Sequence, residues 1–198
     1  MRDMLIETYY RILKHDPLGR LVKDTGLVRS HSYVIQFLEL IYALLDGINK
    51  DATDVAGAET RLSTSTGLFP NYGRVSGGVG GDTYGVVVGT NAGATAEGNE
   101  NYALDTKILH SAVGEAGKLN YQAVTFVGAR AVGANIDLDV SRPYLNETAA
   151  TITVKEIGLI CRNSIDAKYH LLLRDVVTDE DVEAGYTLTV VYTLRTTA

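Results

Sequence analysis

The chain has 198 residues, enough for one well-buried core with at most a small subdomain. Its apolar share of 45% and charged share of 21% are ordinary for a globular protein and exclude wholesale disorder. The formal charge of -6 argues against a nucleic-acid partner, because such proteins need a basic surface to displace the counterions of phosphate. No apolar stretch is long enough to cross a bilayer, and residues 1–10 lack a signal-peptide pattern, so we expect a soluble protein without a membrane partner.

Residues 8–28 are predicted to form a β-hairpin. The segment Asp16-Pro17-Leu18-Gly19 has the residue types of a tight turn, with an aspartate first, a proline whose φ is already set, and a closing glycine. Strand-like segments flank this turn at residues 8–15 and 20–24.

Residues 30–46 show the period of an amphipathic helix. The apolar positions recur at helical spacing and comprise Val34, Phe37, Leu38, Ile41, Leu44 and Leu45. Ser30 or Ser32 is expected to cap the N-terminus of this helix, and Gly47 its C-terminus. So apolar a face must pack on a sheet or on another subunit, which makes Phe37, Ile41 and Leu45 candidate interface residues.

Between residues 49 and 101 the composition shifts toward glycine, threonine, serine, asparagine and alanine. Strands are predicted at Glu59–Ser63 and Tyr84–Thr90, with long loops at 64–83 and 91–101 that we expect to become ordered on contact with a partner. The glycines of residues 73–81 precede a strand instead of a lysine and a helix, so they do not predict a phosphate-binding loop. Residues 114–119 likewise lack the serine or threonine that such a loop needs.

After Tyr102 the pattern becomes strongly β. Short strands are predicted around residues 121–126, 135–140, 152–154, 157–161, 171–177 and 187–194. The alternation shifts near Glu156, which indicates a bulge. Regularly spaced strands without intervening helices predict a mainly β fold, an antiparallel β-sandwich or jelly-roll-like domain with an N-terminal hairpin and one amphipathic helix. We divide the chain into residues 1–50, 51–119 and 120–198, with the last two segments forming one domain.

The residue types that carry chemistry are scattered. The four histidines, His15, His31, His110 and His170, lack partners at metal-ligand spacing, so surface or strand-edge positions are expected. Cys161 lies in an apolar strand pattern, where a buried and unreactive thiol is the ordinary outcome, and a single cysteine fits a reducing cytoplasm.

Three polar groupings are expected to be solvated. Asp137 and Asp139 share one strand face, residues 179–183 form an acidic turn, and Asn146-Glu147-Thr148 marks an exposed turn. A Gly-x-Ser-x-Gly nucleophile elbow is absent from the sequence. We therefore predict that the protein is not an enzyme and has no catalytic, cofactor or metal site.

Residues 151–196 contain the runs E-I-G-L, L-R-D-V-V and G-Y-T-L-T-V-V-Y-T. This pattern resembles the C-terminal module of structural proteins of tailed double-stranded DNA bacteriophages. The opening hairpin, the apolar helix and Tyr102–Lys107 also resemble members of that group, which implies a virion component. Glu156 and Arg174 of these runs are expected to pair across adjacent strands and to fix their register.

We therefore expect a non-enzymatic virion structural protein, made in the host cytoplasm, that acts as a capsid decoration (cement) or accessory protein. Its partners would be further copies of itself, for example in a trimer, and a major capsid or tail protein. A neck, tail or fibre-base adaptor is the first alternative. A receptor- or carbohydrate-binding module is the second, with exposed aromatic candidates at Phe69, Tyr72, Tyr84 and Tyr102. The twelve tyrosines suit interfaces, where a ring is buried while its hydroxyl stays hydrated.

Overall fold

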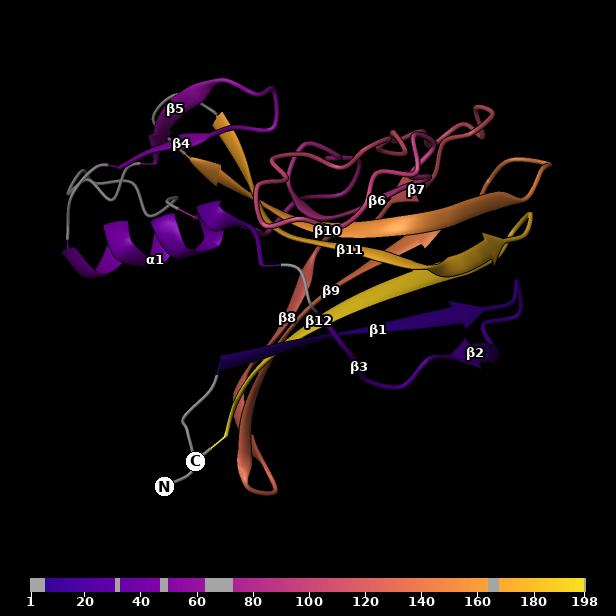
Figure 1. The fold of residues 1–198 in the computed structure, drawn as a ribbon. Helices are drawn as coiled ribbons and strands as arrows, with labels where there is room; N and C mark the ends of the chain where they lie inside the picture. The colour runs from indigo at the N-terminus through magenta and orange to yellow at the C-terminus, as the bar shows by residue number, and fades with distance from the viewer. Residues whose placement is uncertain (1–5, 31–32, 47–49, 63–72, 164–167, 198) are drawn as a thin grey trace.

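The computed structural model describes residues 6–30, 33–46, 50–62, 73–163 and 168–197. Over these residues the protein is mainly antiparallel β with a single α-helix, as the sequence predicts, and two sheets face each other in a sandwich-like arrangement (Figure 1). The larger sheet, sheet A, runs in the order β2 (Leu21–Asp24), β1 (Ile6–His15), β12 (Thr187–Thr197), β9 (Asn135–Leu145), β7 (Asn120–Tyr121), with β3 (Val28–Arg29) also paired to β1 and β8 (Thr125–Val132) also paired to β9.

The second sheet, sheet B, consists of β11 (Lys168–Val182), β10 (Ile152–Asn163) and β6 (Gly85–Gly89), all antiparallel. A separate hairpin of β4 (Lys50–Thr53) and β5 (Glu59–Leu62) lies beside the helix α1 (Ile35–Asp46), at the end of sheet B (Figure 1). The β4 strand is not predicted from the sequence, because four residues of mixed polarity show no period.

The predicted N-terminal hairpin is present. Asp16 builds its turn, since one carboxylate oxygen accepts the main-chain N–H groups of Leu18 and Arg20 at 2.9 Å, and Gly19 adopts a positive φ of 78°. β1 also pairs with β12 along its full length, from Ile6 opposite Thr196 to His15 opposite Thr187. The first and last strands are therefore neighbours in sheet A, and the segment 1–50 contributes a central strand to the main sheet.

The core lies between the inner faces of the two sheets. On β12 the predicted alternation is confirmed, because Leu188, Val190 and Tyr192 are fully buried. Sheet B faces them with fully buried Ile157 and Leu171. Each such side chain stabilises the fold by roughly 1.5–3 kcal/mol relative to an exposed position, so this alternation is the main driving force for sheet packing.

The predicted helix is confirmed as α1, which packs on β11 and on the β4–β5 hairpin. Leu40 is buried and Phe37 is half-buried against Tyr33, with ring centroids 4.7 Å apart, whereas Leu38 is exposed. Ser30 is not the N-cap, because it lies five residues before the helix and its hydroxyl contacts Asp175. Ser32 and Gly47 lie outside the described residues. No helix in the described ranges is long and apolar enough to span a membrane.

The C-terminal strands are longer than the predicted short ones. Two predicted pieces form the single 12-residue strand β10, with the expected bulge between Val154 and Glu156, and β11 extends over 15 residues. A bulge absorbs the shift in alternation without ending the strand. The predicted strand 121–126 is instead divided into β7 and β8, because the N–H of Val124 donates to the carbonyl of Gly77 at 2.8 Å and leaves the sheet ladder.

Candidate functional site

The ion pair between Glu156 and Arg174 is the centre of the C-terminal region. Nε of Arg174 donates to Oε2 of Glu156 at 2.9 Å, and the two side chains are 1% and 0% exposed. The pairing predicted from the sequence is therefore present, across the β10–β11 register. The four remaining N–H donors of the guanidinium also have acceptors, which are the carbonyls of Thr95 and Ala96 and the side-chain oxygens of Asn91 and Asn101.

Glu156 holds the same loop from its other side. Its carboxylate accepts the main-chain N–H groups of Asn91, Asp105 and Thr106 at 2.8–3.3 Å. A buried ion pair offsets its desolvation cost only when its remaining hydrogen-bonding capacity is satisfied, and this pair meets that condition. The loop 91–101, expected to become ordered on contact with a partner, is thus already held by its own chain.

Arg142 on β9 is a second buried arginine, which the sequence analysis missed. It is 0% exposed, and all five of its N–H donors reach main-chain carbonyls, those of Gly78, Gly81, Tyr84, Val86 and Gln122. The guanidinium also lies 4.7 Å from the ring centroid of Tyr121. Burial lowers the pKa of Arg142, but an arginine stays protonated at neutral pH. The signal was available, because strand alternation puts Arg142 on the same face as Val140 and Tyr144.

The described part of the glycine-rich segment, residues 73–83, wraps around this guanidinium. A Cβ on Gly77 would lie 2.6 Å from the carbonyl oxygen of Tyr84 and 3.1 Å from Nη1 of Arg142, so a side chain does not fit there. The expectation that the loop 64–83 becomes ordered on contact with a partner is therefore corrected for residues 73–83, as for residues 91–101, and residues 64–72 lie outside the described part of the chain. The two glycine-rich loops are each clamped by one buried arginine.

Residues of the three sequence runs in 151–196 form this centre. In E-I-G-L, Glu156 binds Arg174 of L-R-D-V, and a Cβ on Gly158 would lie 2.6 Å from Cδ1 of Leu104. Asp175 of L-R-D-V accepts the hydroxyl of Tyr192 from the last run at 3.0 Å. Glu156, Arg174, Asp175 and Tyr192 of the three runs thus contact one another or hold loops, which is a structural role.

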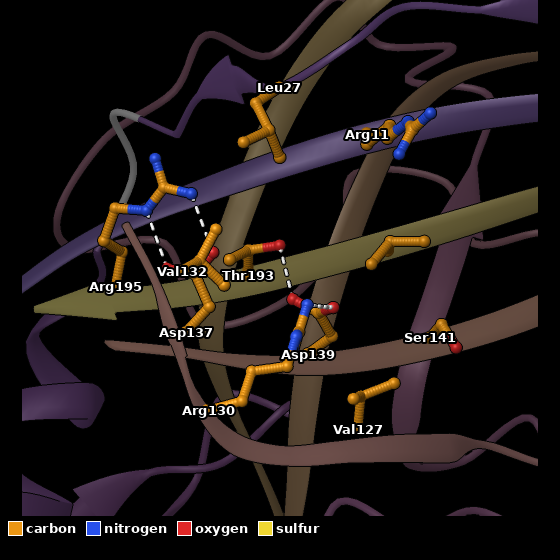
Figure 2. Close-up of a pocket in the computed structure, with 11 residues that line it drawn as sticks. Arg11, Leu27, Val127, Arg130, Val132, Asp137, Asp139, Ser141, Thr193 and Arg195 are labelled. Carbon is orange, nitrogen blue, oxygen red and sulfur yellow. Dashed lines mark hydrogen bonds and ion pairs between the residues drawn. The ribbon is translucent and has the colours of Figure 1, made fainter. Parts of the chain in front are cut away.

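A groove on the outer face of sheet A is lined by charged side chains (Figure 2). Its volume is about 320 Å³. Arg195 makes two contacts of 2.7 Å with Asp137, and Asp139 accepts from Arg130 at 2.5 Å and from Thr193 at 2.7 Å. The hydrogen bonds from Arg195 lower the pKa of Asp137. The prediction of a solvated aspartate is wrong for Asp137, which is 3% exposed and paired.

The acidic segment 179–183 is also different from the prediction. Residues 179–182 form the end of β11 instead of a turn, and Glu180 is buried against Lys23 at 2.6 Å. Asp179 pairs with Lys155, and Glu183 with Lys14. The carboxylate of Asp181 accepts a hydrogen bond from the hydroxyl of Thr153 at 2.6 Å, so the segment is tied to β1, β2 and β10 by three ion pairs and one hydrogen bond.

Two residues expected at the surface are buried. Asn146 is 0% exposed, and its Nδ2 donates to the carbonyls of Ala150 and Val182, so the predicted exposure of residues 146–148 is wrong for Asn146 and Thr148, whereas Glu147 is exposed. His170 is 0% exposed and contacts Thr60 through Nε2 at 3.1 Å, and burial lowers its pKa. Both residues have partners distant in the sequence, since Asn146, which follows β9, reaches the carbonyl of Val182, and His170 on β11 reaches the hydroxyl of Thr60.

Cys161 is a buried free thiol, as predicted, and desolvation raises its pKa to about 12. His31 lies outside the described residues. Within the described ranges, no three histidine, cysteine, aspartate or glutamate side chains gather at a position that would hold a metal ion.

The candidate interface residues belong to different elements. Phe37 and Ile41 lie half-buried on α1, Tyr84 stacks on Tyr169 with ring centroids 6.0 Å apart, and Tyr102 is 44% exposed. The side chain of Leu45, and both Phe69 and Tyr72, lie outside the described part. Tyr102 borders a hollow of about 290 Å³ that Thr95, Glu100, Asn101 and Asp105 also line.

Comparison with family models, with curated proteins and with solved structures finds no match for this chain.

Proposed function

We propose that the protein is a non-enzymatic structural component of a tailed-bacteriophage virion, acting as a capsid decoration (cement) or accessory protein. The observation that carries the proposal is the centre formed by Glu156, Arg174, Asp175 and Tyr192. These four polar residues belong to the sequence runs on which the resemblance to phage structural proteins rests, and they contact one another or their own loops. In this chain the pattern is therefore a requirement of the fold, which supports the proposal.

The distribution of charge supports a structural role. The buried guanidiniums of Arg142 and Arg174 have all five donors satisfied within the chain. Fully satisfied networks of this kind make a fold rigid and unique, which suits a particle component that must withstand external stress. Partner contacts would then use the surface, where the edges of sheet A carry exposed apolar side chains.

The test is to delete the gene from a phage genome that carries it and to examine purified particles. We expect the protein in wild-type particles by mass spectrometry, and gold-labelled antibody distributed over the head. We also expect that heads lacking the protein lose DNA at lower temperature, and that added purified protein restores the wild-type value. Label at a single position on the particle would support the neck, tail or fibre-base adaptor. Absence from washed particles would overturn the proposal.

A second candidate function, saccharide binding, is favoured by the hollow beside Tyr102. An exposed aromatic ring next to carboxylate and amide side chains provides an apolar platform with polar groups around it, as small-molecule sites require. The test is a glycan array with wild-type protein, Tyr102→Ala and the control Tyr9→Ala on β1. Specific binding that only Tyr102→Ala abolishes would support the function, and a blank array would exclude it.

A further inference from the structure

The β4–β5 hairpin is attached to the end of sheet B by individual contacts. Among the described residues it forms a sheet of its own, so no β-ladder continues from it into sheet B (Figure 1). The N–H of Val55 donates to the carbonyl of Tyr169 at 2.9 Å, and Nδ2 of Asn163 donates to the carbonyl of Arg61. Because a two-stranded hairpin is at best marginally stable alone, its position depends on these contacts.

His170 on β11 lies at this junction. Its side chain is 0% exposed, and Nε2 contacts the hydroxyl of Thr60 on β5 at 3.1 Å. Nδ1 is buried as well and has no hydrogen-bond partner among the described residues. A neutral imidazole carries one N–H, whereas a protonated imidazole carries an N–H on both nitrogens. Protonation would therefore place a charge and an unsatisfied donor in the contact between the hairpin and sheet B.

The surroundings of His170 favour the neutral imidazole. Burial lowers the pKa of His170, because it disfavours the charged form. Asp54 in the hairpin turn and two main-chain carbonyls of the hairpin oppose this effect, whereas Lys168 on β11 adds to it. Lys168 and Asp54 are themselves paired at 3.8 Å. Directly opposite His170 on β10 lies Cys161, a neutral thiol whose pKa burial raises to about 12.

The lowered pKa couples the attachment of the hairpin to pH. In the attached state the pKa of His170 lies below 6.5, and in a detached hairpin the imidazole is hydrated and returns to about 6.5. The detached state then binds more protons. Attachment is therefore complete above the ordinary pKa and weakens as pH falls toward the native value. Between pH 7.5 and 5.5, the detachment equilibrium shifts by up to about tenfold.

Detachment would uncover apolar surface. Val55 lies in the hairpin turn and lines an apolar hollow of about 180 Å³ together with Leu104 and Ile160. Leu104 and Ile160 are both buried in the attached state. Because the N–H of Val55 is bound to β11, movement of this turn away from β11 opens the hollow to solvent. Exposed apolar surface of this kind is typical of sites for partner proteins.

We propose that the contact between His170 and the β4–β5 hairpin is an acid-sensitive switch. Protonation of the imidazole releases the hairpin from sheet B and opens the hollow beside Val55. The switch is a property of the isolated chain, so its test does not depend on the proposed virion function.

The test is amide hydrogen exchange of the purified protein, followed by NMR at pH 7.5 and at pH 5.5, with each rate divided by the intrinsic rate at the same pH. The N–H of Val55 reports attachment, since it donates to β11. We expect its protection to fall severalfold at the lower pH, by at most about tenfold, while the β9–β12 ladder stays protected. Equal protection of Val55 at both pH values would overturn the proposal.

Two variants assign the response to one histidine. His170→Gln cannot be protonated and still offers an amide to Thr60, so the protection of Val55 should no longer depend on pH. The matched control His15→Gln, at the end of β1, should retain the wild-type response. An equal response in folded His170→Gln would contradict the inference.

A titration of the wild-type protein supplies a readout that does not depend on the folding of a variant. The carbon shifts of the His170 imidazole should titrate below pH 6.5, and the protection of Val55 should fall over the same pH range. A native imidazole that titrates at or above its ordinary pKa would overturn the proposal, because protonation would then stabilise the attached hairpin.

Discussion

Removing the guanidinium in Arg174→Met tests the buried clamp most directly. Breaking a buried ion pair usually costs about 3–5 kcal/mol, because a charge is left without its partner. Here Glu156 keeps three main-chain N–H donors, and the loop residues that lose Arg174 are mostly exposed and become hydrated. We therefore expect the free energy of unfolding to fall by about 3 kcal/mol, at the lower end of that range, which lowers Tm by about 6–12 °C for a chain of this size.

The assay is urea unfolding followed by circular dichroism, with amide hydrogen exchange as a local readout. Exchange should accelerate at Asn91, Asp105 and Thr106, whose N–H groups depend on the position of Glu156, and should stay slow in the β9–β12 ladder. Arg11→Met is the matched control, because Arg11 forms a two-point ion pair with Asp24 at the surface. The free energy of unfolding should fall several-fold less in Arg11→Met than in Arg174→Met, because exposed ion pairs contribute little. Equal losses in the two variants would refute the claim that burial makes the clamp important.

Three further predictions concern other parts of the core. Arg142→Lys keeps the charge but has three N–H donors for five carbonyls. We expect the free energy of unfolding in urea to fall by about 2–4 kcal/mol and proteolysis at residues 73–83 to become faster. An unchanged urea midpoint would contradict the role of Arg142 in holding this segment. The lowered pKa of Asp137 means that its ionised carboxylate stabilises the native state. This contribution is fully present above the unfolded-state pKa of about 3.9 and is lost as pH falls through the lower pKa of the native state. Between pH 2 and 5, Tm should therefore vary less in Asp137→Asn than in wild type. Gly158→Ala should lower the free energy of unfolding by about 1–3 kcal/mol, because the added Cβ meets Leu104. The control Gly128→Ala has open space around it and should lower the free energy much less. Equal effects would refute the steric explanation.

Much of the architecture was predictable because it depends on local patterns. The Asp16 turn, the apolar face of α1 and the alternation of β12 each arise within a few consecutive residues, so composition and period were sufficient. The bulge before Glu156 was visible as a shift of the same alternation. Even the pair Glu156 and Arg174 was accessible, because the two lie on strands adjacent in the chain that form a hairpin in sheet B.

The tertiary structure alone decided which groups the buried polar residues bind. Arg142 reaches carbonyls 56–64 residues away, in the glycine-rich segment and at the start of β6, and the pairing of β1 with β12 joins the two ends of the chain. Asp137, Asn146 and His170 look solvated in the sequence, since a polar side chain is normally exposed. They are buried because distant strands supply a cation, carbonyls or a hydroxyl at the right distance. Local periodicity determines which strands form, whereas the burial of charge depends on long-range partners that no local pattern contains.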